Sequence, residues 1–162
     1  MKMSEGVEWT AHACALLAAL PPGVGLSAAA LAEFNSLAPA YMAKHMQALA
    51  RGGVVESVRG AGGGYRLARP ATDISLWDIV EAIEGDEPSF RCTEIRQQGP
   101  CVDARSDFRR PCEITAVFRR AETAWRAELK AVSLADIAAE VGRKATPARR
   151  ARLTQWLQEK LA

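Results

Sequence analysis

The sequence predicts a mainly α-helical protein, in which a winged helix-turn-helix with a small β-hairpin wing is followed by a long dimerisation helix. Three observations predict this fold. Apolar residues recur with helical spacing through residues 6–51, where two turns interrupt the pattern. Between residues 54 and 69 the apolar residues instead recur at every second position, on both sides of a run of glycines. A second helical stripe then runs through residues 113–132.

Three helices are expected in the first third of the chain. Residues 6–20 form the first helix, which ends at the proline and glycine residues of 21–25 because these residue types do not continue a helix. Ser27 is a good N-cap for a short second helix. Pro39 suits the first position of the third helix, residues 39–51. The tight turn between these two helices is typical of a helix-turn-helix.

A hairpin follows the third helix. Residues 54–59 and 65–69 read as two short strands joined by the glycine-rich residues 60–64. A nucleotide-binding loop is excluded, because no Lys-Ser/Thr pair follows the glycines and they lie between strands rather than before a helix. A fourth helix begins after Ser75 and completes a winged DNA-binding domain of residues 1–85.

The last part of the chain forms a second helical unit, residues 113–162. Its first helix, residues 113–132, has a long apolar stripe. A single small domain has little surface against which this stripe could be buried. The stripe contains Ile114, Val117, Phe118, Ala121, Trp125, Leu129 and Val132. We expect it to pair with the same helix of a second subunit, and a core helix in a monomer is the alternative. Gly142 and Pro147 are expected to divide two further helices.

The sequence has neither a secretory pattern nor a membrane span. Its N-terminus lacks a basic start followed by an apolar stretch. Its apolar runs are shorter than the roughly 20 residues that cross a bilayer. We therefore expect a cytoplasmic protein that does not associate with membranes, in which cysteines serve metals or redox chemistry more often than structural disulfides.

The third helix and the hairpin offer a surface suited to double-stranded DNA. A helix in the major groove needs small or polar residues at its start and cations that meet phosphates. The candidates are Ala40, Tyr41, Lys44, Gln47 and Arg51 in the helix and Arg59 in the hairpin. The chain is basic between residues 38 and 72, but charge alone does not distinguish a DNA-binding surface from a solvated face. A winged helix that binds only proteins is the alternative.

Residues 41–85, YMAKHMQALARGGVVESVRGAGGGYRLARPATDISLWDIVEAIEG, closely resemble the signature of the Rrf-type regulators. This is the family of the iron–sulfur cluster regulator, the nitric-oxide sensor and the cysteine-metabolism repressor, and the resemblance extends over nearly the whole chain. It implies a homodimeric transcription regulator with two winged domains on a crossed pair of long helices. It also implies binding to a partly palindromic operator in double-stranded DNA.

Three cysteines, Cys92, Cys101 and Cys112, surround an irregular loop of residues 86–112, and their spacing matches no zinc ribbon or finger. Cluster-binding members of the Rrf-type family place three cysteines in this loop. In one branch of redox sensors, a two-iron cluster takes a Glu and a His from the first helix of the other subunit. The segments SEGVEWTAHAC and CTEIRQQGPC resemble that branch, which implies a 2Fe-2S cluster and adds Glu8 and His12 as ligands.

The spacing of the last two loop cysteines departs from the family, whose members place them closer together than Cys101 and Cys112. Three alternatives therefore stay open. Cys101 and Cys112 bind the cluster with Glu8 and His12, or all three loop cysteines bind it, or the chain binds no cluster. In the last case the regulator responds through thiol oxidation or a small ligand, and Glu8 and His12 form an ordinary surface pair.

Two other residues of the first helix have expected roles. Trp9 adjoins Glu8, and we expect it to relay the redox state towards the winged domain, with a core tryptophan as the alternative. Cys14 lies on a different face of the helix from Glu8 and His12, and is expected to be a buried small residue.

An enzyme is the rival class of protein, for example a thiol oxidoreductase that uses Cys92 or Cys112. The sequence contains no Cys-x-x-Cys motif, and its histidines are His12 and His45. Few residues could therefore form a Cys-His catalytic pair, and we expect no catalytic activity.

Overall fold

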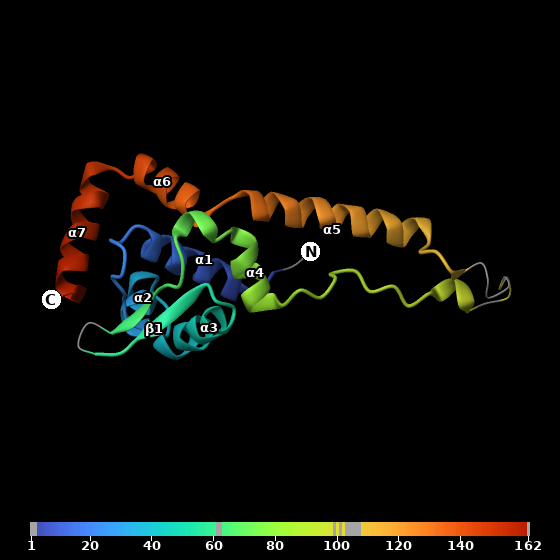
Figure 1. The fold of residues 1–162 in the computed structure, drawn as a ribbon, viewed down its shortest axis with the longest axis horizontal. Coiled ribbons are helices and arrows are strands. Elements are labelled where there is room, and N and C mark those ends of the chain that lie inside the picture. The colour runs from blue at the N-terminus through green and yellow to red at the C-terminus, as the bar shows by residue number, and fades with distance from the viewer. Residues whose placement is uncertain (1–2, 61–62, 99, 101, 103–107, 162) are drawn as a thin grey trace.

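The structure, a computed structural model, describes residues 3–60, 63–98, 100, 102 and 108–161. Figure 1 shows a winged domain from which an arm, formed by α5 and the segment before it, extends to one side. The α-helices are α1 (Glu5–Ala18), α2 (Ala28–Phe34), α3 (Pro39–Arg51), α4 (Leu76–Glu84), α5 (Glu113–Ala131), α6 (Leu134–Lys144) and α7 (Pro147–Leu161). The strands β1 (Val55–Val58) and β2 (Gly64–Leu67) form an antiparallel sheet. The predicted fold class is confirmed.

The helix-turn-helix consists of α2 and α3. The Ser27 side chain accepts a hydrogen bond from the backbone amide of Ala30 (3.1 Å) and so caps α2. Pro39 opens α3, where its missing N–H would have no helical partner. The inner face of α3 is fully buried, as the helical spacing predicts, and it consists of Met42, Met46 and Leu49.

The wing is tied to the segment that precedes α2. Strands β1 and β2 pair with Val55 opposite Leu67 and Val58 opposite Gly64. Beyond them, Leu26 and Tyr65 exchange two backbone hydrogen bonds of 3.0 and 2.8 Å. Because Leu26 directly precedes the cap of α2, these bonds fix the wing against the helix-turn-helix.

Glycine is required at position 64 for this attachment. The backbone of Gly64 has φ of 153°, and a Cβ there would lie 2.3 Å from the carbonyl oxygen of Leu26. We expect Gly64→Ala to lower the free energy of unfolding by about 2 kcal/mol or more, through the backbone clash and the strained φ. Urea denaturation measures this change.

The matched control is Gly142→Ala in α6, where an added Cβ meets nothing within 4 Å. There alanine removes the entropic penalty of a helical glycine, and we expect a gain of about 0.5–1 kcal/mol. Equal effects at positions 64 and 142 would contradict the role assigned to Gly64.

The two C-terminal helices pack on the winged domain. Leu134 of α6 is fully buried, and Leu153, Trp156 and Leu157 of α7 lie against the same hydrophobic core. The two expected helices are present and the chain breaks between Gly142 and Pro147, but α6 continues two residues past Gly142, to Lys144. The chain leaves the helix at Ala145, and Thr146 then caps α7 ahead of Pro147. A residue shortly before proline is disfavoured in a helix, and this preference sets the boundary.

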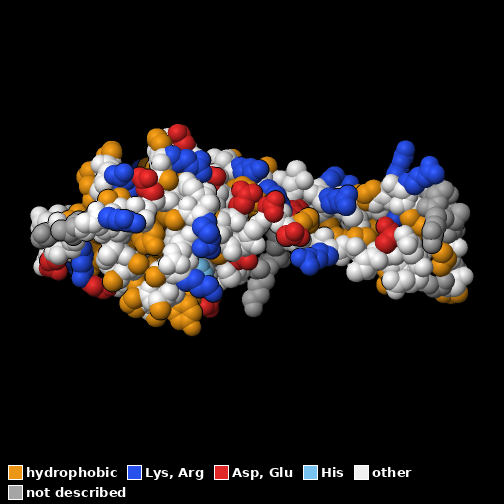
Figure 2. All heavy atoms as spheres, turned by 60° about the horizontal axis from the view of Figure 1, so that its bottom comes forward, with side chains coloured by type: hydrophobic (Ala, Val, Ile, Leu, Met, Phe, Trp, Pro, Cys, Tyr) orange, Lys and Arg blue, Asp and Glu red, His pale blue; other side chains and the backbone are white. Residues whose placement is uncertain are grey.

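Helix α5 is packed at one end and largely exposed at the other. Trp125 and Leu129, near its C-terminal end, contact the cluster of Val7, Trp77 and Val80. Towards its N-terminal end Ile114, Val117 and Phe118 are 64%, 52% and 49% exposed. Figure 2 shows hydrophobic side chains along the arm as well as on the winged domain. None of the described helices has the length and apolar character of a membrane span.

Candidate DNA interface and sensor site

The outer face of α3 carries the predicted DNA-binding residues. Ala40, Tyr41, Lys44, Gln47 and Arg51 are all exposed, on the side away from the buried methionines. Arg59 is exposed just after β1, at the base of the wing. Within the described part of the chain, Lys44, Arg51 and Arg59 make no ion pair. Their cationic groups are therefore available to an external anion.

Helix α1 contacts this face of α3 through aromatic side chains. The half-buried ring of Trp9 lies edge-on to Tyr41, with ring centroids 6.2 Å apart, and to His45, at 5.7 Å. His45 also lies against Gly6, where a Cβ would be 2.5 Å from the imidazole Cε1 atom. Sequence reasoning did not assign a role to His45, although its position four residues after Tyr41 places it on a neighbouring part of α3.

Glu8 and His12 occupy the exposed side of α1, beside Trp9. Their positions, four residues apart in the helix, place both side chains on one face. Cys14 is fully buried, and this burial raises the pKa of its thiol to about 12. The expectation of a buried small residue at position 14 is confirmed, and Cys14 is a poor source of thiolate at neutral pH.

Cys112 is the N-cap of α5. Its half-buried Sγ accepts a hydrogen bond from the backbone amide of Thr115 (3.4 Å) and lies 3.3 Å from the Thr115 hydroxyl. The pKa of the Cys112 thiol is lowered, chiefly by the hydrogen bond with the Thr115 side chain, and further by the Thr115 amide and the Arg96 charge. Thiolates bind iron and zinc, so this thiol is suited to ligation.

Of the other two loop cysteines, Cys92 belongs to the described residues. Cys92 is exposed, and its Sγ accepts a hydrogen bond from the Glu94 amide (3.4 Å). Cys101 lies outside the described residues. Among the residues that are described, no three His, Cys, Asp or Glu side chains come together as a metal site. Figure 1 shows α1 in the winged domain and the N-terminal end of α5, which Cys112 caps, at the far end of the arm. One chain therefore does not bring Glu8, His12 and Cys112 together.

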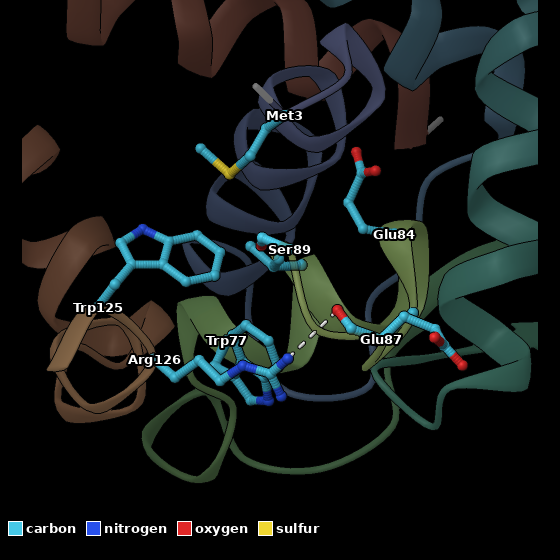
Figure 3. A pocket seen from close by; sticks show the side chains of 9 residues that line it. Met3, Trp77, Glu84, Glu87, Ser89, Trp125 and Arg126 are labelled. Atoms are coloured by element: carbon cyan, nitrogen blue, oxygen red, sulfur yellow. Dashed lines mark hydrogen bonds between the residues drawn. The ribbon is translucent and has the colours of Figure 1, made fainter. Parts of the chain in front are cut away.

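The start of the cysteine loop is fastened to α5 by Arg126. Its guanidinium donates to the carbonyls of Asp86 (2.7 Å) and Glu87 (3.4 Å), and lies over the Trp77 ring at 4.5 Å. Figure 3 shows this contact in a pocket lined by Met3, Trp77, Trp125 and Arg126, among others. Further along, the Phe90 ring stacks on Phe118 at 4.3 Å. The start of the loop, residues 86–90, is thereby coupled to α5.

The sequence matches one family model over most of its length. The model of the Rrf2 family, described as an iron-dependent transcriptional regulator, covers residues 3–140. This chain belongs to the Rrf2 family. The predicted resemblance to the Rrf-type regulators is confirmed, and as an Rrf2-family member the chain is a DNA-binding transcriptional regulator. The family model and the relative YffB are both described as transcriptional regulators.

Curated relatives share the sequence over most of the chain, and solved structures share its fold. YffB of Lactococcus lactis is 32% identical over 140 residues, which are 86% of this chain and 88% of YffB. CymR, the global cysteine regulator of B. subtilis, has a similar fold with a TM-score of 0.69 and 23% identity, covering 86% of this chain and 98% of CymR. T. potens IscR gives a TM-score of 0.67 at 24% identity, over 90% and 93% of the two chains.

Proposed function

We propose that this Rrf2-family chain is a cytoplasmic homodimeric transcription regulator whose binding to a partly palindromic operator is controlled by a 2Fe-2S cluster. The signal would be the redox or nitrosative state. One observation carries the proposal: Trp9 of α1, between the candidate ligands Glu8 and His12 in sequence, contacts Tyr41 and His45 of the DNA-reading helix. The sensing helix and the reading helix are therefore in direct contact.

DNA recognition is assigned to the exposed face of α3 and to the wing. Ala40 is small enough for the start of α3 to approach the wall of the major groove, and the Gln47 amide is able to form hydrogen bonds with the edge of a base. Lys44, Arg51 and Arg59 supply cations for phosphates, with Arg59 placed to approach the minor groove. Tyr41, which is 61% exposed, is available to the DNA on its free side.

Loss of one phosphate contact provides the test of this interface. We expect Lys44→Ala and Arg59→Ala each to weaken operator binding about tenfold, and to reduce the slope of log Kd against log salt by about one. Fluorescence anisotropy with a duplex selected from a random pool measures both quantities. Arg143→Ala in α6, whose side chain pairs with Glu140, is the control and should leave binding unchanged. Unchanged binding by both interface variants would refute the proposed surface.

Dimerisation is assigned to α5. Exposed apolar residues that recur on one helix face mark an interaction surface, and Ile114, Val117 and Phe118 form such a face. A second copy of the same helix is the economical partner, because a two-fold pair covers both stripes at once. A dimer would also bring two copies of α3 to the half-sites of an operator, about 34 Å apart.

The sensor site is assigned to residues of two subunits. Cys112, with its lowered pKa, and Cys92 or Cys101 supply thiolates from one chain. The partner subunit's Glu8 and the partner subunit's His12 would complete the set. These donor types fit an iron–sulfur cluster, which accepts imidazole or carboxylate in place of thiolate. When bound, such a cluster supplies a one-electron change of charge beside α1.

Trp9 is proposed as the redox relay. Its ring separates the ligand-bearing side of α1 from Tyr41 and His45, and a shift of α1 moves the surfaces on which both α3 side chains rest. Because the ligand set spans two chains, its rearrangement also changes how the two winged domains are spaced. Either change alters the fit of the paired α3 helices to two half-sites.

A cluster-free thiol switch is the second candidate, favoured by the lowered pKa of Cys112 and the exposure of Cys92. The structural likeness to CymR, a cysteine regulator, is compatible with it. Iron and acid-labile sulfide measured after anaerobic purification separate the candidates. About two irons per chain with visible absorbance support the cluster, whereas a colourless, iron-free protein whose DNA affinity changes on thiol oxidation supports the switch.

A further inference from the structure

The C-terminal helix α7 lies outside the part of the chain that the family model covers. That match ends at residue 140, and α7 spans Pro147–Leu161. Figure 1 shows α7 at the end of the winged domain opposite the arm. It contacts the domain through one face, whose apolar members Leu153, Trp156 and Leu157 lie against the core.

The closest contacts of α7 are with the last turn of α2. The Trp156 ring lies 4.9 Å from the Phe34 ring, and its Nε1 donates a hydrogen bond to Oε1 of Glu33 (3.1 Å). Lys160 Nζ donates to the other carboxylate oxygen, Oε2, at 2.7 Å. Both oxygens of Glu33 are thus bound by α7, and the pKa of Glu33 is lowered, chiefly by the Lys160 hydrogen bond.

Helix α2 connects the parts that read DNA. It has seven residues, and so short a helix has little stability without tertiary contacts. Its inner residues, with Leu31 fully buried, support α3. Just before its N-terminus, Leu26 is hydrogen-bonded to Tyr65 of the wing. The orientation of α2 therefore affects both α3 and the wing.

We propose that Trp156 and Lys160 of α7 are positioning residues for DNA binding, which hold α2 on its outer side and thereby fix α3 relative to the wing. This inference rests on the DNA-binding function proposed above. Neither side chain needs to touch DNA. Glu33 links α7 to the helix-turn-helix, because its carboxylate accepts hydrogen bonds from both Trp156 and Lys160.

A charge swap tests the contact. We expect Lys160→Glu to weaken operator binding about fivefold, because it repels Glu33 and releases α7 from α2. The double variant Glu33→Lys/Lys160→Glu keeps the wild-type net charge and restores the ion pair but not the Trp156 hydrogen bond, so it should recover part of the affinity lost in Lys160→Glu. The control is Arg152→Glu on the exposed side of α7, which makes the same charge change without altering Glu33. It should bind more tightly than Lys160→Glu.

Three results would overturn the proposal: wild-type affinity in Lys160→Glu, no recovery in the double variant, or an equal loss in Arg152→Glu. Hydrogen exchange of the full-length protein gives a readout that does not depend on DNA. Trp156→Ala should speed exchange of the α2 amides about tenfold. Unchanged exchange would refute the positioning role even if DNA binding is confirmed. If the wild type binds no duplex, the proposed DNA-binding function fails. Faster exchange of the α2 amides in Trp156→Ala would still show that α7 stabilises α2.

Discussion

Val117→Asp is expected to convert the proposed dimer into monomers. Val117 lies at the centre of the uncovered stripe of α5 and is half exposed in a single chain. A carboxylate at this position would be buried between two apolar helix faces without a partner, which costs several kcal/mol. We expect the dimer dissociation constant to rise at least about 100-fold. Sedimentation equilibrium measures it directly.

The matched control is Ala127→Asp, which introduces the same charge on α5 away from the stripe. It should remain dimeric. The monomeric Val117→Asp variant should also lose tight binding to an operator with two half-sites, because one winged domain makes half of the contacts. A Val117→Asp protein that sediments as a dimer would place the subunit interface elsewhere.

Cys112→Ser is expected to remove the proposed 2Fe-2S cluster while preserving the fold. Serine is a good N-cap, so the bond from the Thr115 amide that starts α5 is retained. A hydroxyl does not replace a thiolate as a cluster ligand. We expect at least about tenfold less iron per chain after anaerobic purification, and loss of visible absorbance.

Cys14→Ala is the control for loss of a thiol. Cys14 is buried and behaves as a small apolar residue, so the variant should retain iron and colour. His12→Ala, on the exposed side of α1, should resemble Cys112→Ser if the partner's helix completes the site. Full iron content in Cys112→Ser would exclude Cys112 as a ligand.

Local sequence signals predicted the winged domain well, because its elements are defined by nearby residues. Ser27, Pro39 and Ser75 stand at the starts of helices, and the methionine spacing on α3 identifies its buried face. The division of the last two helices was also predicted, but α6 ends two residues after Gly142, because an isolated glycine weakens a helix without ending it. The break falls just before Pro147, where the steric constraint is stronger.

Contacts between distant segments could not be predicted from periodicity. Trp156 and Glu33 are 123 residues apart, and no local pattern pairs them. His45 lies against both Trp9 and Gly6 of α1, and no local pattern links it to either residue. The sensor site is even harder to predict from the sequence, because its proposed ligands come from two subunits. One of them, Cys101, lies outside the described residues.

The most direct test compares the operator affinity of one preparation that carries the proposed iron–sulfur cluster before and after a chelator removes the iron. We expect the two Kd values to differ at least about tenfold, the usual range of coupling between two sites. The difference should disappear in Cys112→Ser. Equal affinities of the iron-loaded and iron-free wild type would contradict control of DNA binding by a cluster.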